Sequence, residues 1–380
     1  MKLAFFNNSL NHHQVNVADE LYKILGDDYV FITTIARNQI RFKGGANFDT
    51  RPYCLCAGDD ADARKKAMEY ARTAEVCVFG MSSLDYAIER AKYNKKALSF
   101  ELGERWLKKG LLNILSPHLL RWWFTYQRYF RNANFYKLNS SAFGGIDHYR
   151  MFSYRNRCYK WGYFTKVDDN FKVEASSQGT STSGITSLMW CARFLKWKHP
   201  ELPVQLAARL KQNGYKYTID MFGSGDEFDN TKKLIEDLGV KDRVNLCGNR
   251  PNEEILKEMR KHDIFLFTSD RHEGWGAVSN ESMSNGCVLV GADAIGSIPY
   301  LIQDGVNGMI FKSGSLDSLY TKVKYLIDNP QERLLMSKNG VKTMHDVWSP
   351  ACAANNLLTL IDDLLNGRES SIKEGPCSKA

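Results

Sequence analysis

Short apolar runs alternate with helix-patterned segments along most of the chain, and this alternation limits the fold more than any other feature. In the first half, apolar runs at residues 2–6, 29–33 and 75–80 are set between segments with helical periodicity, such as 18–25 and 62–74. A second series of apolar runs occupies residues 188–194, 217–223, 243–248, 263–269 and 287–292, and helical stretches such as 204–213 and 231–239 separate them. Short continuous apolar runs are typical of strands buried on both faces. The pattern therefore predicts two parallel sheets with helices on their faces.

The break between the two series predicts where one domain ends. Residues 166–186 lose their large apolar side chains and are rich in Ser, Thr and Gly, which is typical of an interdomain linker. With 380 residues, the chain is long enough for about two domains. We expect two doubly wound α/β domains, 1–170 and 186–350, that face each other across a cleft. A helix over 351–366 is expected to pack back toward the first domain, and the polar residues 367–380 are expected to form a flexible tail.

Composition excludes several classes of protein. No apolar run approaches the roughly 20 residues needed to span a bilayer, and the amino terminus becomes polar too quickly for a secretory signal, so we expect a cytoplasmic protein. The nine cysteines include no CxxC pair and lie mostly in apolar, strand-like runs. Buried free thiols are therefore expected in place of a disulfide framework or a zinc site, and no metal site is predicted.

Two glutamates eight positions apart mark the main candidate site. Glu273 and Glu281 follow the predicted strand 263–269, and Gly274 and Gly276, which flank Trp275, come directly after the first glutamate. Ligands of open α/β sheets bind beyond the carboxyl ends of the strands, and glycine lets the backbone approach them closely. Two carboxylates at this place can accept hydrogen bonds from the hydroxyl groups of a sugar and a ribose. The alternative is structural: Glu273 caps the helix that follows, and Glu281 is only solvated.

The same segment resembles the donor-binding core of the retaining glycosyltransferases of family 4. Their pattern E-G-F-G-x-x-x-x-E corresponds here to residues 273–281, with Trp275 in place of the usual Phe. Upstream, residues 191–211 are similar to the family's G-R-L-x-x-x-K-G segment, which aligns Arg193 and Lys198 with its phosphate-binding pair. The turn 221–227 is similar to a family G-x-G turn. The resemblance covers about residues 186–330.

This resemblance implies the GT-B fold, in which two Rossmann-like domains face each other, and a hexosyltransferase that retains the anomeric configuration. It implies that Arg193 and Lys198 stabilise a diphosphate leaving group and that Glu273 lies at the transferred sugar. Glu281 is expected at the ribose. The other expected donor-binding residues are Gly223, Gly225, Gly274, Trp275, Gly276 and Ala277. The nucleoside diphosphate sugar is the donor substrate, and no cofactor is implied.

The first domain departs from the family pattern. Many relatives have a Gly-Gly turn after the first strand, whereas this chain has the polar loop 7–14. That loop lies at a strand end, so its amide and imidazole groups are candidates for contact with the acceptor. Segments 99–110 and 159–164 are similar to a subgroup of bacterial surface-polysaccharide glycosyltransferases. The candidate acceptor-side residues are Asn11, His12, His13, Glu104 and Arg105.

Residues 105–146 contain no acidic residue, and basic residues alternate there with aromatic ones. Such a stretch suits an anionic membrane interface, with Trp122 and Trp123 among the aromatic anchors, and it also suits single-stranded nucleic acid. A third interpretation is an amphipathic helix whose aromatic residues fill the core. The net charge of +8 does not choose between these partners.

Two classes of function follow. The first, which we favour, is a peripheral enzyme on the inner face of the membrane that builds surface polysaccharide: capsule, O-antigen or lipopolysaccharide. Its partners would be a nucleotide sugar and a glycan or lipid-linked glycan acceptor, and no nucleic acid. The second is a nucleic-acid-binding protein that uses residues 105–146. A nucleotide-sugar epimerase or a phosphorylase with the same fold is a closer rival of the first.

Overall fold

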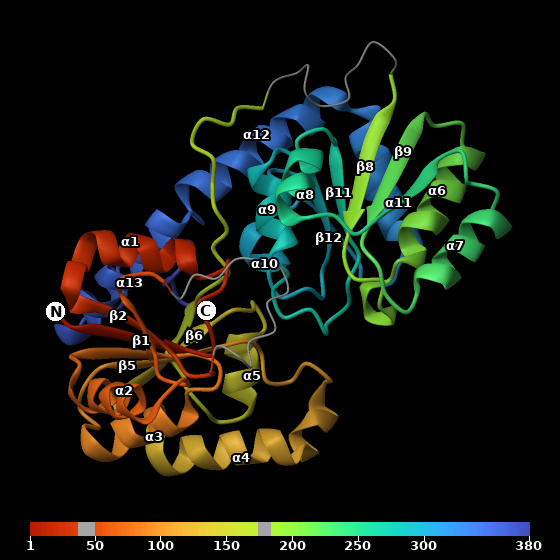
Figure 1. The fold of residues 1–380 in the computed structure, drawn as a ribbon. Coiled ribbons are helices and arrows are strands. Elements are labelled where there is room, and N and C mark those ends of the chain that lie inside the picture. Colours follow the sequence, from red (N-terminus) through yellow and green to blue (C-terminus); the bar gives the residue numbers. More distant parts are fainter. Residues whose placement is uncertain (37–49, 174–183) are drawn as a thin grey trace. The chain divides into compact units, whose positions relative to one another are not determined.

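The computed structural model describes residues 1–36, 50–173 and 184–380. The chain forms two compact units, one made of Met1–Lys166 with Val347–Ala380 and the other of Val167–Asp346 (Figure 1). The first domain therefore contains both ends of the chain. The predicted linker 166–186 is described only in part, because its residues 174–183 lie outside the described residues.

The first domain contains a fully parallel sheet with the strand order β3-β2-β1-β4-β5-β6-β7. Its strands are β1 Leu3–Asn7, β2 Tyr29–Thr33, β3 Cys54–Cys56, β4 Val76–Phe79, β5 Ser99–Gly103, β6 Phe135–Asn139 and β7 Cys158–Lys160. All residues of β1 and β4 are buried, which explains why these strands are continuous apolar runs in the sequence. The predicted parallel sheet is confirmed for this domain.

Helices cover both faces of the first sheet (Figure 1). On one face, α1 (Val15–Leu25) packs beside α13 (Pro350–Leu365). On the other face lie α2 (Ala61–Thr73) and α3 (Leu84–Tyr93), and α4 (Pro117–Thr125) continues into a π-helical turn that contacts α3. A 3-10 turn, Leu111–Leu115, precedes α4, and α5 (Gly144–Arg150) follows β6.

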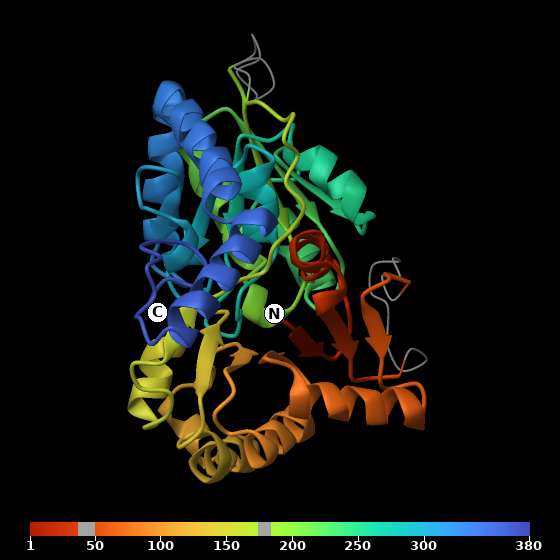
Figure 2. The same ribbon diagram turned by 90° about the vertical axis from the view of Figure 1, so that its left-hand side faces the viewer.

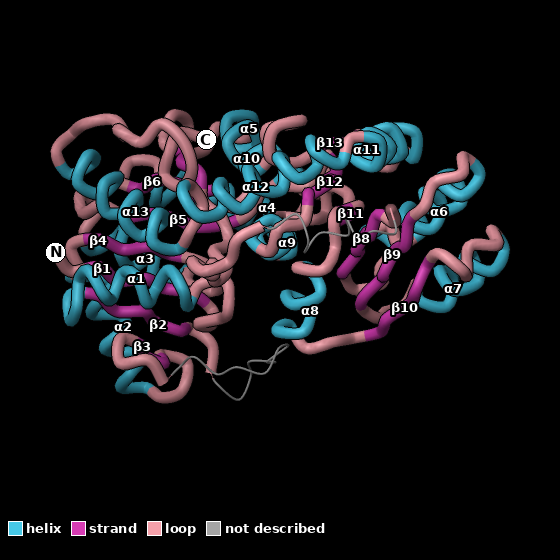
Figure 3. The backbone as a smooth tube through the Cα atoms, turned by 90° about the horizontal axis from the view of Figure 1, so that it is seen from above, coloured by secondary structure: helices cyan, strands magenta, loops and turns pink. Residues whose placement is uncertain are grey.

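The second domain contains a parallel sheet with the order β10-β9-β8-β11-β12-β13. Its strands are β8 Thr186–Cys191, β9 Tyr217–Phe222, β10 Val244–Gly248, β11 Ile264–Phe267, β12 Val288–Ala292 and β13 Met309–Phe311. Its helices are α6 Glu201–Gln212, α7 Phe228–Asp237, α8 Asn252–Met259, α9 Val278–Ser284, α10 Ile298–Leu301, α11 Leu316–Asp328 and α12 Pro330–Asp346. Figure 3 shows α6 and α7 on one side of the sheet and α8 and α9 on the other. Both predicted doubly wound domains are therefore present.

The carboxyl-terminal tail differs from the prediction. Residues 367–380 were expected to be flexible, yet Cys377 is fully buried and its backbone N–H donates to Lys160 O at 2.7 Å. Tyr159 and Lys379 form an antiparallel bridge, so the tail extends the edge of the sheet at β7. Figure 2 shows the C-terminus beside the yellow segment that contains α5. Pairing with an unsatisfied strand edge orders this polar segment, and local composition does not reveal such a partner.

Within the described residues, no helix is long and apolar enough to cross a membrane.

Candidate functional site

Lys198 and Glu273 form an ion pair at the carboxyl ends of β8 and β11. The Lys198 ammonium group donates a hydrogen bond to Glu273 Oε2, and the two side chains are only 11% and 12% exposed. Ser269 Oγ also donates to Glu273 Oε2, at 3.1 Å. The sequence placed both residues at one site, and the structure brings them together. Arg193 lies on the same loop, two residues beyond β8, and its side chain is exposed.

The turn that carries Lys198 is held rigidly. Thr268 Oγ1 donates to Lys198 O at 2.7 Å, and the buried indole of Trp190 donates to Thr268 Oγ1 at 2.9 Å. The backbone N–H of Asp270 donates to Trp197 O at 3.0 Å. The residues after β8 and after β11 are thus joined by backbone and side-chain hydrogen bonds, which fixes the position of the ammonium group.

His199, which follows Lys198, has the left-handed φ of +52°. The glycosyltransferase pattern that this segment resembles has glycine at that place, and a non-glycine residue there is strained. The imidazole is held by two carboxylates, with Nδ1 2.7 Å from Glu201 Oε1 and Nε2 3.7 Å from Asp270 Oδ2. The hydrogen bond to Glu201 is the largest cause that raises the pKa of His199 above its ordinary value of 6.5. The charged form of His199 therefore stabilises this turn.

Glu281 lies one turn inside α9, and its carboxyl group is buried. Burial raises its pKa from 4.5 to about 7, and in the described part of the chain the side-chain hydrogen bond that opposes this rise comes from Asn252 Nδ2, 3.4 Å from Oε1. The neighbouring Cys191 thiol, whose pKa burial raises to about 12, is influenced by the charges of both Glu281 and Lys198. The two carboxylates and the ammonium group therefore gather around the end of β8. A buried carboxylate with so few donors is ready to accept hydrogen bonds from a ligand.

Two positions of the β9–α7 turn require glycine because of their backbone conformation and the closeness of a neighbouring loop. Gly223 has a φ of +128°, and a Cβ atom there would lie 1.9 Å from Ala192 O. At Gly225, with φ +150°, a Cβ atom would lie 2.5 Å from Phe194 O. The backbone that these glycines approach closely is that of the loop after β8, and their contact with a nucleotide stays a prediction. These glycines position the loop that carries Arg193.

Gly276 is required in the same way, because its φ is +80° and a Cβ atom would lie 2.3 Å from the Phe267 ring. The Trp275 side chain, in contrast, is fully buried, and its indole donates to Asn280 Oδ1 at 2.8 Å. The sequence motif predicts that Trp275 is one of the donor-binding residues. Since its side chain faces the interior, only its backbone can contribute to a ligand site. Gly274 is buried and Ala277 is half-buried at the start of α9.

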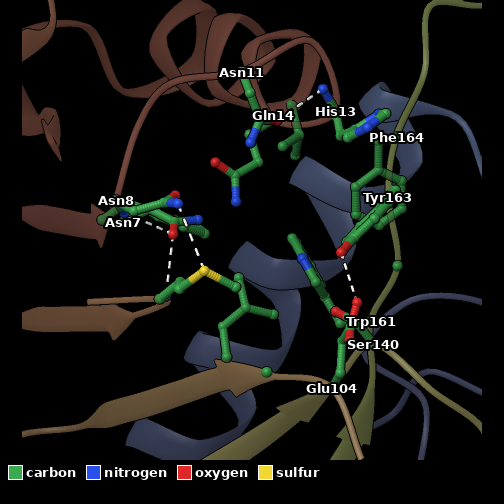
Figure 4. Close-up of a pocket in the computed structure, with 16 residues that line it drawn as sticks. Asn7, Asn8, Asn11, His13, Gln14, Glu104, Ser140, Trp161, Tyr163 and Phe164 are labelled. Carbon is green, nitrogen blue, oxygen red and sulfur yellow. Dashed lines mark hydrogen bonds between the residues drawn. The ribbon is translucent and has the colours of Figure 1, made fainter. Parts of the chain in front are cut away.

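The first domain contains a separate pocket of about 140 Å³ (Figure 4). Its walls come from the residues that follow β1, β4, β5, β6 and β7, so it lies at the carboxyl ends of these parallel strands. Asn11, His13 and Glu104 line it, as expected for the acceptor side. His12 and Arg105 do not line the pocket. The guanidinium of Arg105 instead forms two hydrogen bonds of 3.1 Å with the buried carboxylate of Asp147, so its role is structural.

The pocket is polar but carries little charge. Burial lowers the pKa of His13 to about 3, so its imidazole is neutral, and its ring stacks on Tyr163 at 4.9 Å. Tyr163 OH donates to Glu104 Oε1 at 2.8 Å, and Lys108 neutralises the same carboxylate. Within the described part of the chain, buried His13 Nδ1 and Gln14 Oε1 lack a hydrogen-bond partner. These atoms are available to a ligand with hydroxyl groups.

Sequence reasoning missed several pocket residues. Ser140, Trp161 and Tyr163 line the pocket but were not among the candidate residues, whereas Gln14 belongs to the candidate loop 7–14. Ser140 directly follows β6 and Trp161 directly follows β7. These residues could have been found in the sequence as polar or aromatic residues that come directly after a predicted strand. The segment 159–164 had been noted only for its family likeness.

In the described residues, no cluster of three or more His, Cys, Asp or Glu side chains could hold a metal ion.

In a comparison with known protein families, residues 184–343 match the family described as "Glycosyl transferases group 1". Poly(glycerol-phosphate) alpha-glucosyltransferase of Bacillus subtilis is 31% identical over 124 residues, which are 33% of this chain and 18% of that protein. Lipopolysaccharide core biosynthesis glycosyltransferase LpsE of Rhizobium meliloti is 26% identical over 174 residues, which are 46% of this chain and 49% of the relative. The chain spans less than half the length of these relatives.

Solved structures establish the fold. HepE of Anabaena in complex with UDP has a TM-score of 0.67 and 16% identity, covering 97% of this chain and 100% of its own. Sucrose-phosphate synthase of Thermosynechococcus elongatus has a TM-score of 0.69 and 13% identity, with the same two coverages. Together with the two parallel sheets, these likenesses show a two-domain α/β GT-B fold. Within this fold, the match to the group 1 glycosyltransferases is confined to residues 184–343, which belong to the second domain.

Proposed function

We propose that this chain, whose residues 184–343 match the group 1 glycosyltransferases, transfers a sugar from a nucleoside diphosphate sugar to a glycan acceptor. We further propose that the configuration at the anomeric carbon is retained. The observation that carries the proposal is the Lys198–Glu273 ion pair at the end of β8, with the buried Glu281 carboxyl nearby.

The ion pair explains how two opposite charges are held together in one site. Lys198 and Glu273 neutralise each other, and their side chains are nearly closed to solvent. A bound diphosphate attracts the ammonium group, and the exposed guanidinium of Arg193 can swing to the same charge. Glu273 is then free to accept hydrogen bonds from hydroxyl groups of the transferred sugar. Donor binding therefore replaces the Lys198–Glu273 ion pair by contacts of the cations with the diphosphate and of Glu273 with the sugar.

Departure of the diphosphate is the step at which the cations act. As the bond between the anomeric carbon and the phosphate oxygen breaks, negative charge grows on the leaving group, and Lys198 and Arg193 stabilise it. The acceptor proton passes to an oxygen of the departing diphosphate, so no protein base is needed on the acceptor side. Glu281 accepts hydrogen bonds from the ribose hydroxyl groups and fixes the nucleotide.

The first-domain pocket suits one uncharged sugar unit of the acceptor. Among the described residues no lysine or arginine lines it, its histidine is neutral, and its carboxylate is already paired. Asn, Gln and Ser side chains offer hydrogen bonds to hydroxyl groups, and Trp161 and Tyr163 offer flat apolar contacts. We infer that an acceptor hydroxyl group enters this pocket on a sugar and not on a phosphate.

We also propose that the acceptor is lipid-linked and that the enzyme works in the cytoplasm, at the inner face of the membrane, in the synthesis of a surface polysaccharide. The activities for which two relatives are named support this proposal. One is a lipopolysaccharide core glycosyltransferase and the other is a poly(glycerol-phosphate) glucosyltransferase.

The experiment measures nucleoside diphosphate released from a panel of UDP and GDP sugars by the purified chain. Lys198→Ala is expected to reduce release from the preferred donor by about 10²-fold or more, because one cation at the leaving group is lost. Lys196→Ala is the matched control, since Lys196 lies in the same turn but is exposed. Equal rates in both variants, with both folded, contradict the proposal. Isomerised donor without release of nucleotide would assign the chain to the epimerases.

A further inference from the structure

Three leucines of one short turn point into solvent. Leu111, Leu112 and Leu115 are 62%, 83% and 76% exposed, although they lie within five residues of each other. Single exposed leucines are common on protein surfaces, but a contiguous apolar patch marks a binding surface.

The turn is held in place by the rest of the fold, and this fixes the exposed position of the leucines. It begins at Gly110, which has a φ of +81°, and Asn113 Nδ2 donates to Trp106 O at 2.7 Å. Ile114, in the same turn, packs inward against a small core cluster formed by Leu107, Leu119 and Met151. One side of the turn is therefore anchored while the other side carries the three exposed leucines.

Neighbouring segments extend the apolar patch. Phe124 of α4 and Phe152, which follows α5, are 62% and 66% exposed. These two segments are joined, because the Trp123 indole donates to Met151 O at 2.8 Å and Gln127 Nε2 donates to Phe152 O at 3.3 Å. We define the leucine surface as the exposed apolar residues Leu111, Leu112, Leu115, Leu120, Phe124, Tyr149 and Phe152.

The segments that carry the leucine surface have a large excess of basic over acidic residues. Residues 105–166 contain twelve lysines and arginines but a single acidic residue, Asp147. Asp147 is fully buried and is paired with Arg105, so it does not contribute negative charge to the surface. The exposed cations of the surrounding segments are Lys109, Arg121, Arg128, Arg131, Arg150 and Arg155.

We propose that the leucine surface binds anionic phospholipid bilayers, with the three leucines inserted among the acyl chains and the cations at the headgroups. Exposed aliphatic side chains on a segment flanked by exposed lysine and arginine match a bilayer, which is apolar beneath an anionic layer. Single-stranded nucleic acid is matched less well, because leucine offers no ring on which bases can stack. This inference deepens the proposed function. The binding of lipid is argued from the surface itself, and only the biological purpose of that binding rests on the proposed function.

The structure also revises which residues enter the lipid. The sequence indicated Trp122 and Trp123 as anchors, but both are partly buried and both indoles are engaged, with His118 and Met151. Trp123 packs on the cluster beneath the turn. The aliphatic turn before α4 thus takes the role that composition alone gave to the tryptophans.

The test is sedimentation of the full chain with vesicles of phosphatidylcholine, with and without phosphatidylglycerol, at low and high salt. The parent is expected to bind anionic vesicles at low salt, and Leu111→Ser, Leu112→Ser and Leu115→Ser combined should weaken binding by about tenfold or more. The control combines Ile24→Ser, Leu335→Ser and Leu365→Ser, which are also exposed but lie elsewhere. It should bind like the parent. Unchanged thermal unfolding shows that each variant is folded.

Hydrogen exchange provides a second measurement, in which anionic vesicles should protect residues 108–125 of the parent. The proposal is overturned if the parent ignores anionic vesicles at low salt, if the leucine variant binds as the parent does, or if protection appears only elsewhere. It is also overturned if the leucine variant loses affinity for single-stranded RNA and not for vesicles. None of these readouts depends on sugar transfer, so a failure here is distinct from a failure of the proposed enzyme activity.

Discussion

Replacing Glu281 by Gln should stabilise the protein at high pH while weakening donor binding. The carboxyl group is buried, and its pKa is raised from 4.5 to about 7 because burial penalises the charge. Below pH 4.5 the group is protonated in both folded and unfolded chains, so it costs nothing. As the pH rises from 4.5 to about 7, the unfolded chain ionises first, and stability is lost through this window. The amide variant cannot ionise and escapes this loss.

The size of the effect follows from the two pKa values. A rise of this size in the pKa lowers the free energy of unfolding of the parent by roughly 3 kcal/mol between the low and high ends of the pH window. For a domain of 150–250 residues, about 1 kcal/mol changes the melting temperature by roughly 2–4 °C. Between pH 5 and pH 8, Glu281→Gln should therefore gain roughly 5–10 °C in melting temperature relative to the parent. Scanning calorimetry at the two pH values measures this difference directly.

Donor binding should respond in the opposite sense. Ribose hydroxyl groups stabilise the ionised carboxylate, so the affinity of the parent for its donor should rise as the pH increases through about 7. Isothermal titration should show this dependence in the parent and not in Glu281→Gln, which should bind more weakly at pH 8. A variant whose gain in melting temperature is the same at pH 5 and pH 8, and whose donor affinity equals that of the parent, would refute the reasoning.

Three further predictions concern the same domain. Glu273→Gln should lower kcat by about 10²-fold with a smaller change in KM, which steady-state kinetics would show; a change in KM alone would place the residue elsewhere. Gly223→Ala should cost about 3 kcal/mol or more, because its Cβ would lie 1.9 Å from Ala192 O, whereas Gly214→Ala, with open space around it, should cost about 1 kcal/mol in thermal unfolding. The stabilisation from protonated His199 is lost as the pH rises through its pKa, above 6.5, so kcat should fall there; His199→Asn should remove that fall. An identical pH profile in that variant would count against the positioning role.

Much of the fold could be predicted because strands buried on both faces leave a plain mark in the sequence. The apolar run 29–33 coincides with β2, and the run 287–292 contains β12, all of whose residues are buried. The Lys198–Glu273 site could also be predicted, since both residues lie just beyond strands and belong to spaced motifs. Parallel strands bring their carboxyl ends to one edge, and the resemblance to a known family singled out these two residues among those that follow the strands.

Other features depend on tertiary contacts that local composition does not encode. The tail around Cys377 is polar in sequence, yet it is ordered by the free edge of β7. Trp275 stands inside a ligand-binding motif, but Asn280 holds its indole in the interior. Leu112 is apolar and yet exposed, whereas Trp122, which the sequence indicated as an anchor, is partly buried. In each case burial is decided by a neighbour far away in the sequence or by the shape of a turn.

The central claim, that the Lys198–Glu273 site transfers a sugar from a nucleoside diphosphate donor, is tested most directly by proton NMR of the anomeric signals during turnover. The chain is incubated with its preferred nucleotide sugar and a lipid-linked glycan acceptor, and donor and product are followed together. We predict that a new glycoside forms at the rate at which donor is consumed, with the anomeric configuration of the donor. A product of inverted configuration, or a donor that is returned unchanged or epimerised, would contradict it.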